Sequence, residues 1–393
     1  MQPFPSLASA SLRRDWPLLV EACSPLLNPA QFGEKTLRLP EPELLVPLAH
    51  QHGVVAHLYS TITRAGSCHF GDALVEAVRS ARREQVLATM SLTAELLRLQ
   101  RVFIESGLEF LVTKGPVLAC RAYGNPAARG YADLDFLLRQ SDILPAARQI
   151  IAAGYNSQIP LRVIEGKRIP GEYIFHKPGT QSILELHTQH SFRYFPRPLP
   201  IEEFFRRQTV VDVDGRAIPA LSAEDEFVLI SVHGAKHFWE RLMWIADVAA
   251  IVHNCCEIDW SRIKRTAADV GAERMVRVSL LLAHRVLRTA VPATMEREVA
   301  ADSACAKIVK KIESWLPYAG NEPPALVQRA LFRFQIQGQL LAGARYLTRL
   351  SLTPTQEDWV GDSNAPAAAL RESLRRPFRL AKKYRRNPNA PGS

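Results

Sequence analysis

LVTKGPVLACRAYGNPAARGYADLDFLL, from Leu111 to Leu138, places two short apolar runs on either side of a helical segment. The first run, Leu108 to Thr113, predicts a buried strand that ends in a Lys-Gly turn. Pro116 suits the first position of the helix that follows. Gly124-Asn125-Pro126 ends this helix, and Tyr131 to Arg139 predicts the next strand. The stretch therefore predicts a compact strand-helix-strand unit.

An acid, a hydrophobe and an acid interrupt the second apolar run at Asp133, Leu134 and Asp135. Because alternate side chains of a strand share one face, both carboxylates would point one way while Leu134 and Phe136 point the other. Neighbouring carboxylates repel each other, and inside a packed domain this repulsion needs a counter-charge, most simply a divalent cation with oxygen ligands. The triplet is therefore a candidate Mg²⁺ site.

A third carboxylate lies downstream in a predicted hairpin. Glu172 to His176 and Ser182 to Thr188 would form its strands, around a turn at Lys177-Pro178-Gly179-Thr180. Glu185 shares a strand face with His187, and if this strand lies beside the acidic triplet, three carboxylates converge on one patch. Such a patch is what two-metal phosphoryl transfer requires. We expect His187 to orient Glu185 rather than to act as a base.

The Lys-Gly turn before the first helix could hold phosphate. Gly115 would let phosphate oxygens approach the backbone, and the N-terminus of the next helix supplies free N–H groups and partial positive charge. Lys114 adds a point charge, and Arg129, close before Asp133 in the sequence, could bind the same phosphates as a fork. Alternatively, Gly115 only turns the chain, and both cations are exposed or pair with the acids.

The order of these motifs resembles the uncharacterised nucleotidyltransferase family within the DNA polymerase β-like superfamily. Leu111 to Leu138 matches that family's Lys-Gly turn, short helix ending in Tyr, loop with Arg, and Asp-x-Asp strand. Glu185-Leu186-His187 matches its third-carboxylate strand. His233 to Asp247, HGAKHFWERLMWIAD, resembles its downstream helical element. The matches together span roughly Leu108 to Val252.

The resemblance implies a role for each matched residue. The metal-binding and catalytic carboxylates would be Asp133, Asp135 and Glu185. The residues that hold the triphosphate of an NTP would be Lys114, Gly115 and Arg129. The usual Gly-Ser pair of the wider superfamily is absent, because Gly115 is followed by Pro116, and we expect Lys114 to replace the serine contact.

His233, Lys236 and His237 lie on a segment with a helical pattern, where the two histidines share a face. We expect this face to line the nucleotide cleft, with Trp239 close to the base or the phosphates.

Other interpretations of this segment stay open. Two histidines at this spacing can bind zinc, but Gly234 stands where a zinc protease needs Glu. The histidines could instead be polar residues of a packed helix with Trp244 and Ile245 in the core. Asp247 could support the site or pair with Arg241.

The activity implied by the resemblance is Mg²⁺-dependent transfer of an NMP group from an NTP to an acceptor, with release of pyrophosphate. Two Mg²⁺ ions are implied, and the acceptor could be a small molecule, a peptide or protein, or a nucleic acid. Phosphoryl transfer would use the same metal site. The alternative is a non-catalytic nucleotide-binding or interaction module, although keeping three mutually repelling acids argues against it.

Composition is that of an ordinary globular protein, with 47% hydrophobic and 22% charged residues among 393. We find no apolar run long enough to cross a bilayer and no signal-peptide pattern at the N-terminus, so we expect a cytoplasmic protein. The six cysteines lack framework spacing. A structural zinc at His253, Cys255 and Cys256 is a minor alternative.

The net charge of +10 is concentrated near the end of the chain, where Arg371 to Arg386 reads RESLRRPFRLAKKYRR. Such a run favours weak contact with polyanions, an anionic membrane surface included, although a solvated tail is the simpler interpretation.

The chain as a whole is predicted to be an α+β protein. A polymerase β-like nucleotidyltransferase core, with a small mixed sheet and helices, would lie between N- and C-terminal helical regions. Ser222 should cap the first C-terminal helix, with Asp225 completing a capping box. The predicted units are residues 1–99 (N-terminal helical region), 100–215 (core), 216–350 (C-terminal helical domain) and 351–393 (basic tail).

Overall fold

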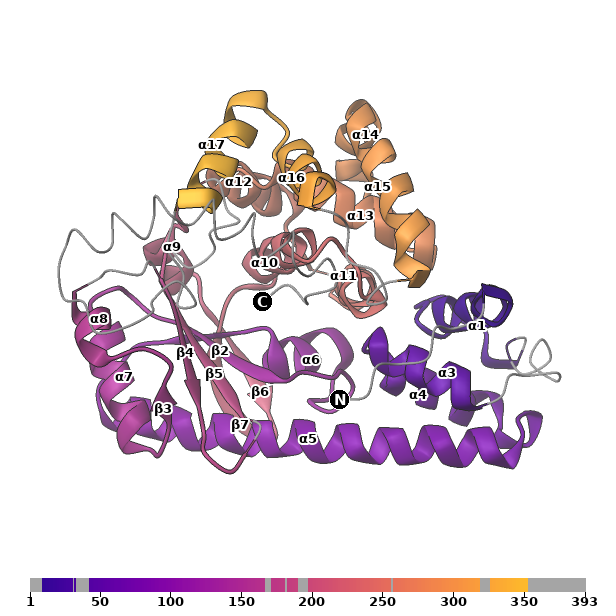
Figure 1. Ribbon diagram of the computed structural model, residues 1–393, viewed down its shortest axis with the longest axis horizontal. Helices are drawn as coiled ribbons and strands as arrows, with labels where there is room; N and C mark the ends of the chain where they lie inside the picture. Colours follow the sequence, from indigo (N-terminus) through magenta and orange to yellow (C-terminus); the bar gives the residue numbers. More distant parts are fainter. Residues whose placement is uncertain are drawn as a thin grey trace.

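The structure, a computed structural model, describes residues 9–30, 32, 42–166, 171–180, 182–189, 197–255, 257–318 and 326–352. A mixed sheet and the long helix α5 (Asp72–Glu105) organise the molecule, and further helices pack above and beside them (Figure 1). The predicted α+β class is confirmed. The predicted basic tail, Arg371 to Arg386, lies outside the described residues.

Seven strands form the sheet in the order β3-β4-β5-β2-β1-β7-β6. Their bounds are β1 (Leu111–Thr113), β2 (Asp133–Leu137), β3 (Asn156–Ser157), β4 (Glu172–His176), β5 (Ile183–His187), β6 (Thr209–Val213) and β7 (Arg216–Ala220). The pairs β2–β5 and β1–β7 are parallel, and the other neighbours are antiparallel. The predicted hairpin is found as β4 and β5.

Strands β3 and β7 are elements of the sheet that the sequence pattern did not predict. Asp214-Gly215 is the turn of a hairpin that joins β6 to β7. Pro219 lies within β7 and opposite Val210, and prolines are unusual inside strands. The sheet therefore continues to Ala220, beyond residue 215.

The N-terminal helices are α1 (Ser9–Ala22), α3 (Pro42–Gln51), α4 (Val55–Ala65), the short 3₁₀ helix η1 (Ser67–His69) and α5. The helical pattern over residues 43–59 is broken between α3 and α4, where Gly53 has a φ of +69°. Helix α5 runs under both the N-terminal helices and the sheet (Figure 1).

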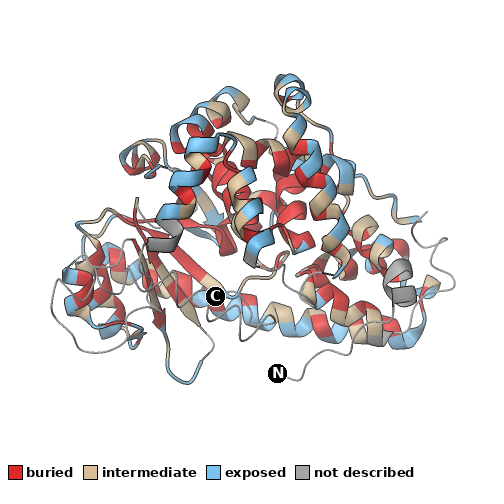
Figure 2. Cartoon of the chain, turned by 45° about the horizontal axis from the view of Figure 1, so that its top comes forward, coloured by how far each residue is buried: buried red, intermediate tan, exposed pale blue. Residues whose placement is uncertain are grey.

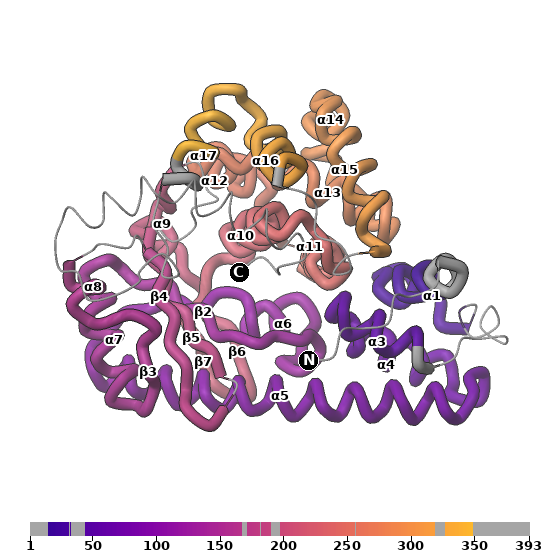
Figure 3. Tube along the Cα trace, viewed as in Figure 1, coloured from indigo at the N-terminus to yellow at the C-terminus, as the bar shows by residue number. Residues whose placement is uncertain are grey.

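Helices α6 (Gly115–Tyr123), α7 (Ile143–Ala152), α8 (Leu161–Glu165) and α9 (Ile201–Arg206) connect the strands. Helix α6 contacts β1, β2 and β6 on one side and α11 on the other (Figure 3). It therefore lies between the sheet and the C-terminal helices.

The C-terminal region consists of helices α10 (Ala223–Lys236), α11 (Leu242–Asn254), α12 (Trp260–Val270), α13 (Glu273–Leu287), α14 (Ala293–Ala301), α15 (Ser303–Trp315), η2 (Leu316–Tyr318), α16 (Leu326–Gln335) and α17 (Leu340–Leu352). Ser222 caps α10 as predicted, because its Oγ accepts the N–H of Asp225 at 3.2 Å. The Asp225 carboxylate is bonded to Arg207, at 2.6 and 2.7 Å. None of the described helices is long and apolar enough to span a membrane.

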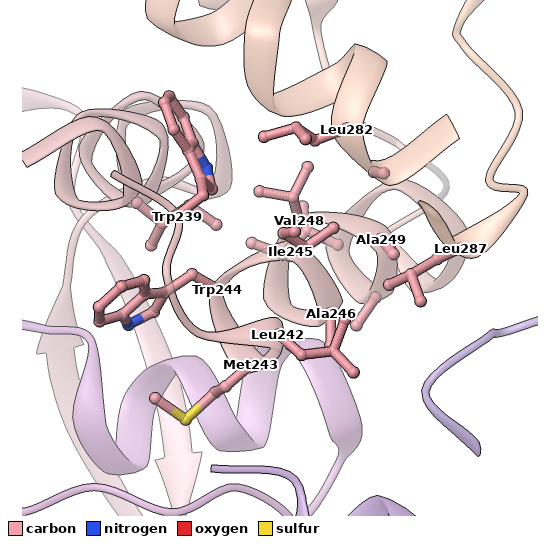
Figure 4. Close-up of a cluster of buried hydrophobic side chains, with 14 of the residues drawn as sticks. Trp239, Leu242, Met243, Trp244, Ile245, Ala246, Val248, Ala249, Leu282 and Leu287 are labelled. Atoms are coloured by element: carbon pink, nitrogen blue, oxygen red, sulfur yellow. The ribbon is translucent and has the colours of Figure 1, made fainter. Parts of the chain in front are cut away.

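Buried residues line the inner faces of the helices and the sheet (Figure 2), and the hydrophobic ones form two clusters. One lies between α5, α7 and the sheet face that carries Leu134 and Phe136. The other joins the N-terminal helices to α10, α11 and α13, and Figure 4 shows its centre around Trp239, Ile245 and Leu282. The sheet face that carries the acids is opposite the α5 cluster.

Candidate active site

The acidic triplet and the third carboxylate lie on neighbouring parallel strands. Asp135 of β2 is directly opposite Glu185 of β5, and Asp133 is opposite Ile183. Strand alternation puts Asp133, Asp135 and Glu185 on one face, while Leu134 packs into the α5 cluster on the other. The structure thus places the three carboxylates on one sheet face, but Asp133 is not in the group whose ligand atoms lie within 4.8 Å of one another.

Asp135 is almost fully buried and has two cationic partners. Lys114 Nζ donates to its Oδ1 at 2.9 Å, and His187 Nε2 is 2.7 Å from the same oxygen. Burial alone would raise the pKa of Asp135, but Lys114 and His187 hold it well below its usual range. The counter-charge that the triplet requires is therefore supplied, for Asp135, by the protein itself.

The pKa values of Lys114 and His187 are shifted in the opposite direction to that of Asp135. Burial opposes the charge of Lys114, yet the attraction of Asp135, Asp133 and Glu185 raises its pKa above the usual value. His187 is buried too, and its contacts with Asp135 and Glu185 raise its pKa to about 9. Both side chains are thus held in the charged form by the acids around them.

Asp133 differs from Asp135 in its surroundings. It is half-buried, at the beginning of β2. Burial and the neighbouring charge of Asp135 raise its pKa to about 6, against the attraction of Lys114. A divalent cation would remove this penalty on the charged carboxylate.

The Lys-Gly turn has an uncommon backbone conformation. Lys114 has φ 54° and ψ −143°, and Gly115 has φ +43°. The Lys114 N–H donates to Glu226 Oε1 of α10 at 3.1 Å, and Glu226 is paired with Arg121. No sequence pattern predicts this contact, because the two residues are far apart in the chain. Acidic residues such as Glu226 are also common in the first turn of a helix.

Arg129 is bonded to a buried acid rather than exposed near the triplet. Its Nε lies 2.8 and 2.9 Å from the two carboxylate oxygens of Asp247 on α11, and Tyr123 Oη donates to the same carboxylate at 3.0 Å. Of the two alternatives for Asp247, pairing with Arg241 is therefore not found, and its partners are Arg129 and Tyr123. Arg129 still acts electrostatically on Asp133, lowering the pKa of that carboxyl.

His233 and His237 lie with their ring centroids 4.7 Å apart, and each also contacts Trp244, at 5.4 and 5.0 Å. Burial lowers the pKa of both histidines well below the usual range, and Lys114 and Lys236 add to the effect. Two neutral imidazoles and an indole thus lie within the electrostatic reach of the Lys-Gly turn.

The expectation that Trp239 lies near the nucleotide is wrong. Trp239 is fully buried, and its indole fills the space where a Cβ on Gly234 would be, with Nε1 only 2.3 Å from that position. It points away from Trp244 (Figure 4). Trp244, which the core interpretation included, is the tryptophan that contacts the histidines.

The arrangement of ligand atoms fits a divalent cation. Within the described residues, one group of three potential ligands converges, Asp135, Glu185 and His187, with one ligand atom of each within 4.8 Å of the others. His187 Nε2 is 2.7 Å from Asp135 and 3.2 Å from Glu185. These are the hydrogen-bond distances of the protonated imidazole, so a divalent cation at this position would take the place of the proton on His187 Nε2.

His187 is the ligand candidate that the sequence did not single out, although the acid-apolar-His pattern contained it. No such convergence involves His253 and Cys255 in the part of the chain that the structure describes, and Cys256 lies outside it.

A family model described as an uncharacterised nucleotidyltransferase matches residues 40–288. The match covers the Lys-Gly turn, the acidic triplet, Glu185 and the histidine pair. No curated protein and no solved structure matches the chain. Since the matched segment covers more than half of the sequence, and includes the two strands that carry the acids, the chain belongs to the uncharacterised nucleotidyltransferase family.

Proposed function

We propose that the protein transfers an NMP group from an NTP to an acceptor and releases pyrophosphate. Membership in the family supports nucleotidyl transfer in general. The observation that carries the proposal is the pairing of β2 with β5, which sets Asp135 opposite Glu185 with Asp133 on the same face. The acceptor, be it a small molecule, a peptide or protein, or a nucleic acid, follows from neither observation.

The carboxylates Asp133, Asp135 and Glu185 would hold two Mg²⁺ ions, with His187 as an additional ligand to one of them. When bound, such ions neutralise the triphosphate and make the acceptor hydroxyl easier to deprotonate. Lys114 already lies against Asp135, so it would share that carboxylate or move from it toward phosphate.

The nucleotide would lie between the acids and α10. Lys114, Gly115 and the first turn of α6 offer positive charge and N–H groups to phosphate oxygens. Arg129, whose Nε is bonded to Asp247, would act on the triphosphate through its charge. We assign His233, Lys236 and His237 to the same nucleotide, and Trp244 supports the two imidazoles.

In the proposed reaction, the acceptor oxygen forms a bond to the α-phosphorus, and the bond from that phosphorus to the oxygen bridging to the β-phosphate breaks. Pyrophosphate leaves with that oxygen. The acceptor proton would pass to Glu185, whose side chain is 18% exposed, whereas that of Asp135 is 1% exposed. Glu185 is therefore better placed to exchange the proton with solvent.

The test is incubation of the purified protein with Mg²⁺, candidate acceptors and each NTP, labelled on either the α- or the γ-phosphate. Transfer of the α-label with pyrophosphate release is expected, and Asp133→Ala and Asp135→Ala should abolish it. Asp212→Ala is the matched control, because this exposed acid lies on the edge strand β6 of the same sheet. Transfer of the γ-label instead would assign phosphoryl transfer.

A second candidate, a non-catalytic nucleotide-binding module, is favoured by one observation. Lys114 and His187 neutralise Asp135 within the protein, so its retention does not by itself require a metal ion. NTP binding that is lost in Lys114→Ala, without turnover of any NTP, would select this candidate over the enzyme.

A further inference from the structure

The backbone of Lys114 has a conformation that residues other than glycine rarely adopt. Its φ of 54° combined with a ψ of −143° is a conformation found almost only in glycine. Helix α6 starts at the next residue, Gly115, so the backbone conformation of Lys114 sets the direction of α6 relative to β1. A strained residue persists only when its surroundings fix it.

Three contacts fix Lys114. Its ammonium group donates to Asp135, and its carbonyl accepts the N–H of Leu118 in α6 at 3.0 Å. The third contact comes from outside this unit, because the Lys114 N–H donates to Glu226 Oε1 at 3.1 Å. Glu226 is buried, and it lies on α10, the helix that also carries His233 and Lys236.

Glu226 divides its two oxygens between two donors. Oε1 accepts from Lys114, and Oε2 is paired with Arg121 of α6. The Arg121 guanidinium also donates to Thr209 Oγ1 at 2.9 Å and to the Leu221 carbonyl at 2.6 Å. Arg121 thereby fixes Glu226 in the position from which it accepts the Lys114 N–H.

We infer that Glu226, held by Arg121, is a positioning residue that sets the Lys-Gly turn for phosphate. It keeps Lys114 in the conformation that brings the ammonium group to the acids and the first turn of α6 to the same side. The consequence for nucleotide binding rests on the proposed function, whereas the effect on the backbone does not.

Glu226→Gln tests the inference with little change in volume. Gln places an oxygen at one of the two Glu226 oxygen positions and an NH2 group at the other, so either Arg121 or the Lys114 N–H meets a donor in place of an acceptor. We expect the KM for the NTP to rise about 10- to 100-fold, as for other small displacements of a binding group. The affinity for inorganic tripolyphosphate with Mg²⁺, measured by calorimetry, should fall by a similar factor.

Asp225→Asn is the matched control, because Asp225 is the adjacent residue of α10 and is also buried and paired with an arginine, Arg207. Both variants lose one buried carboxylate-arginine pair, so a similar fall in Tm is expected for both. Only Glu226→Gln should change the KM and the affinity for tripolyphosphate. If the KM and the affinity for tripolyphosphate are the same in the two variants, Glu226 has only a structural role.

Hydrogen exchange separates this inference from the proposed function. In Glu226→Gln, the amides of residues 111–118 should exchange at least about tenfold faster than in Asp225→Asn, whether or not the protein transfers nucleotides. Unchanged exchange would overturn the inference. Faster exchange without NTP turnover by the wild-type protein would overturn only the proposed function. If Glu226→Gln does not fold, Arg121→Lys, which keeps the charge but loses the fork, should show smaller changes in the same direction.

Discussion

At the scale of single residues, the charges of the site depend on contacts between distant parts of the sequence. Asp133 and Asp135 are adjacent on one strand face, as alternation requires, but they differ in burial and in partners. Lys114 and His187 neutralise Asp135, while Asp133 lies half-buried with a pKa of about 6. The pair therefore combines one carboxylate that is charged at every ordinary pH with one that gains most from a bound cation.

When a metal ion displaces its Nε2 proton, His187 should bind that ion as well as orient Glu185. Removing the imidazole should lower the affinity for a metal ion about 10- to 100-fold, the range typical of groups that orient a metal ligand, and Mg²⁺ should depend on it less because Mg²⁺ prefers oxygen ligands. We expect His187→Ala to weaken Mn²⁺ binding by about that factor and Mg²⁺ binding by less, in titrations followed by calorimetry. His176→Ala, an exposed histidine at the end of β4, is the control. If the Mn²⁺ affinity of His187→Ala is unchanged, His187 is not a metal ligand and acts only through its hydrogen bonds.

At the scale of elements, regular local patterns were predictable and long-range contacts were not. Alternation and turn residues located β2 and the β4–β5 hairpin, but the pairing of β2 with β5 required the structure. The break between α3 and α4 at Gly53 is not evident from the sequence, because the helical period of the apolar residues continues across it. The contact between Lys114 and Glu226 has no local pattern, since 112 positions separate them.

Helix α5 supports the site from the opposite face of the sheet. Leu96 is fully buried in the cluster with Leu134 and Phe136, whereas Leu87 of the same helix is 66% exposed. Leu96→Ala should lower the free energy of unfolding by about 2–5 kcal/mol, because it leaves a cavity in this cluster. Leu87→Ala should change it by less than about 0.5 kcal/mol. Urea denaturation of both variants measures the difference, and similar values would contradict the packing of α5 against β2.

The contact between α3 and α11 should be sensitive to acid. His52, just after α3, accepts the N–H of Leu242 through Nδ1 at 3.3 Å. Burial, with a smaller effect of Arg241, lowers the pKa of His52 to about 3, whereas the unfolded chain titrates near pH 6.5. The contribution of His52 to stability is therefore fully present above about pH 6.5, and it is lost as the pH falls toward 3.

The size of this effect is measurable. Between pH 7.5 and pH 5, His52 should account for a loss of about 2 kcal/mol in the free energy of unfolding. His52→Asn retains a neutral acceptor for the Leu242 N–H and should remove this loss in urea denaturation. His50→Asn, an exposed histidine of α3, should keep it. The same pH dependence in His52→Asn and in the wild type would exclude His52 as its source.

At the scale of the whole molecule, helices beyond the family-matched segment complete the core next to the site. The match ends at residue 288, yet side chains of α15 and α16 belong to the same cluster as α10 and α11. They close over the connection between those two helices, where Phe238 and Trp239 have φ values of 58° and 47°. This connection directly follows His237, so its packing bears on the histidine pair.

Phe332 of α16 is the residue through which this packing can be tested. Its ring is fully buried and lies 5.0 Å from Phe238 and 5.7 Å from Trp315. Phe332→Ala should lower the free energy of unfolding by about 3–5 kcal/mol in urea denaturation. Since Phe238 loses the ring that fixes it, the KM for the NTP should rise as well under the proposed function.

The adjacent Leu331, 49% exposed, provides the control. Leu331→Ala should leave both the stability and the KM close to the wild-type values. If Phe332→Ala proves as stable as Leu331→Ala, α16 does not close the core over Phe238. If it is destabilised with an unchanged KM, the C-terminal helices stabilise the fold without positioning His237, and the nucleotide site is complete within the family-matched segment.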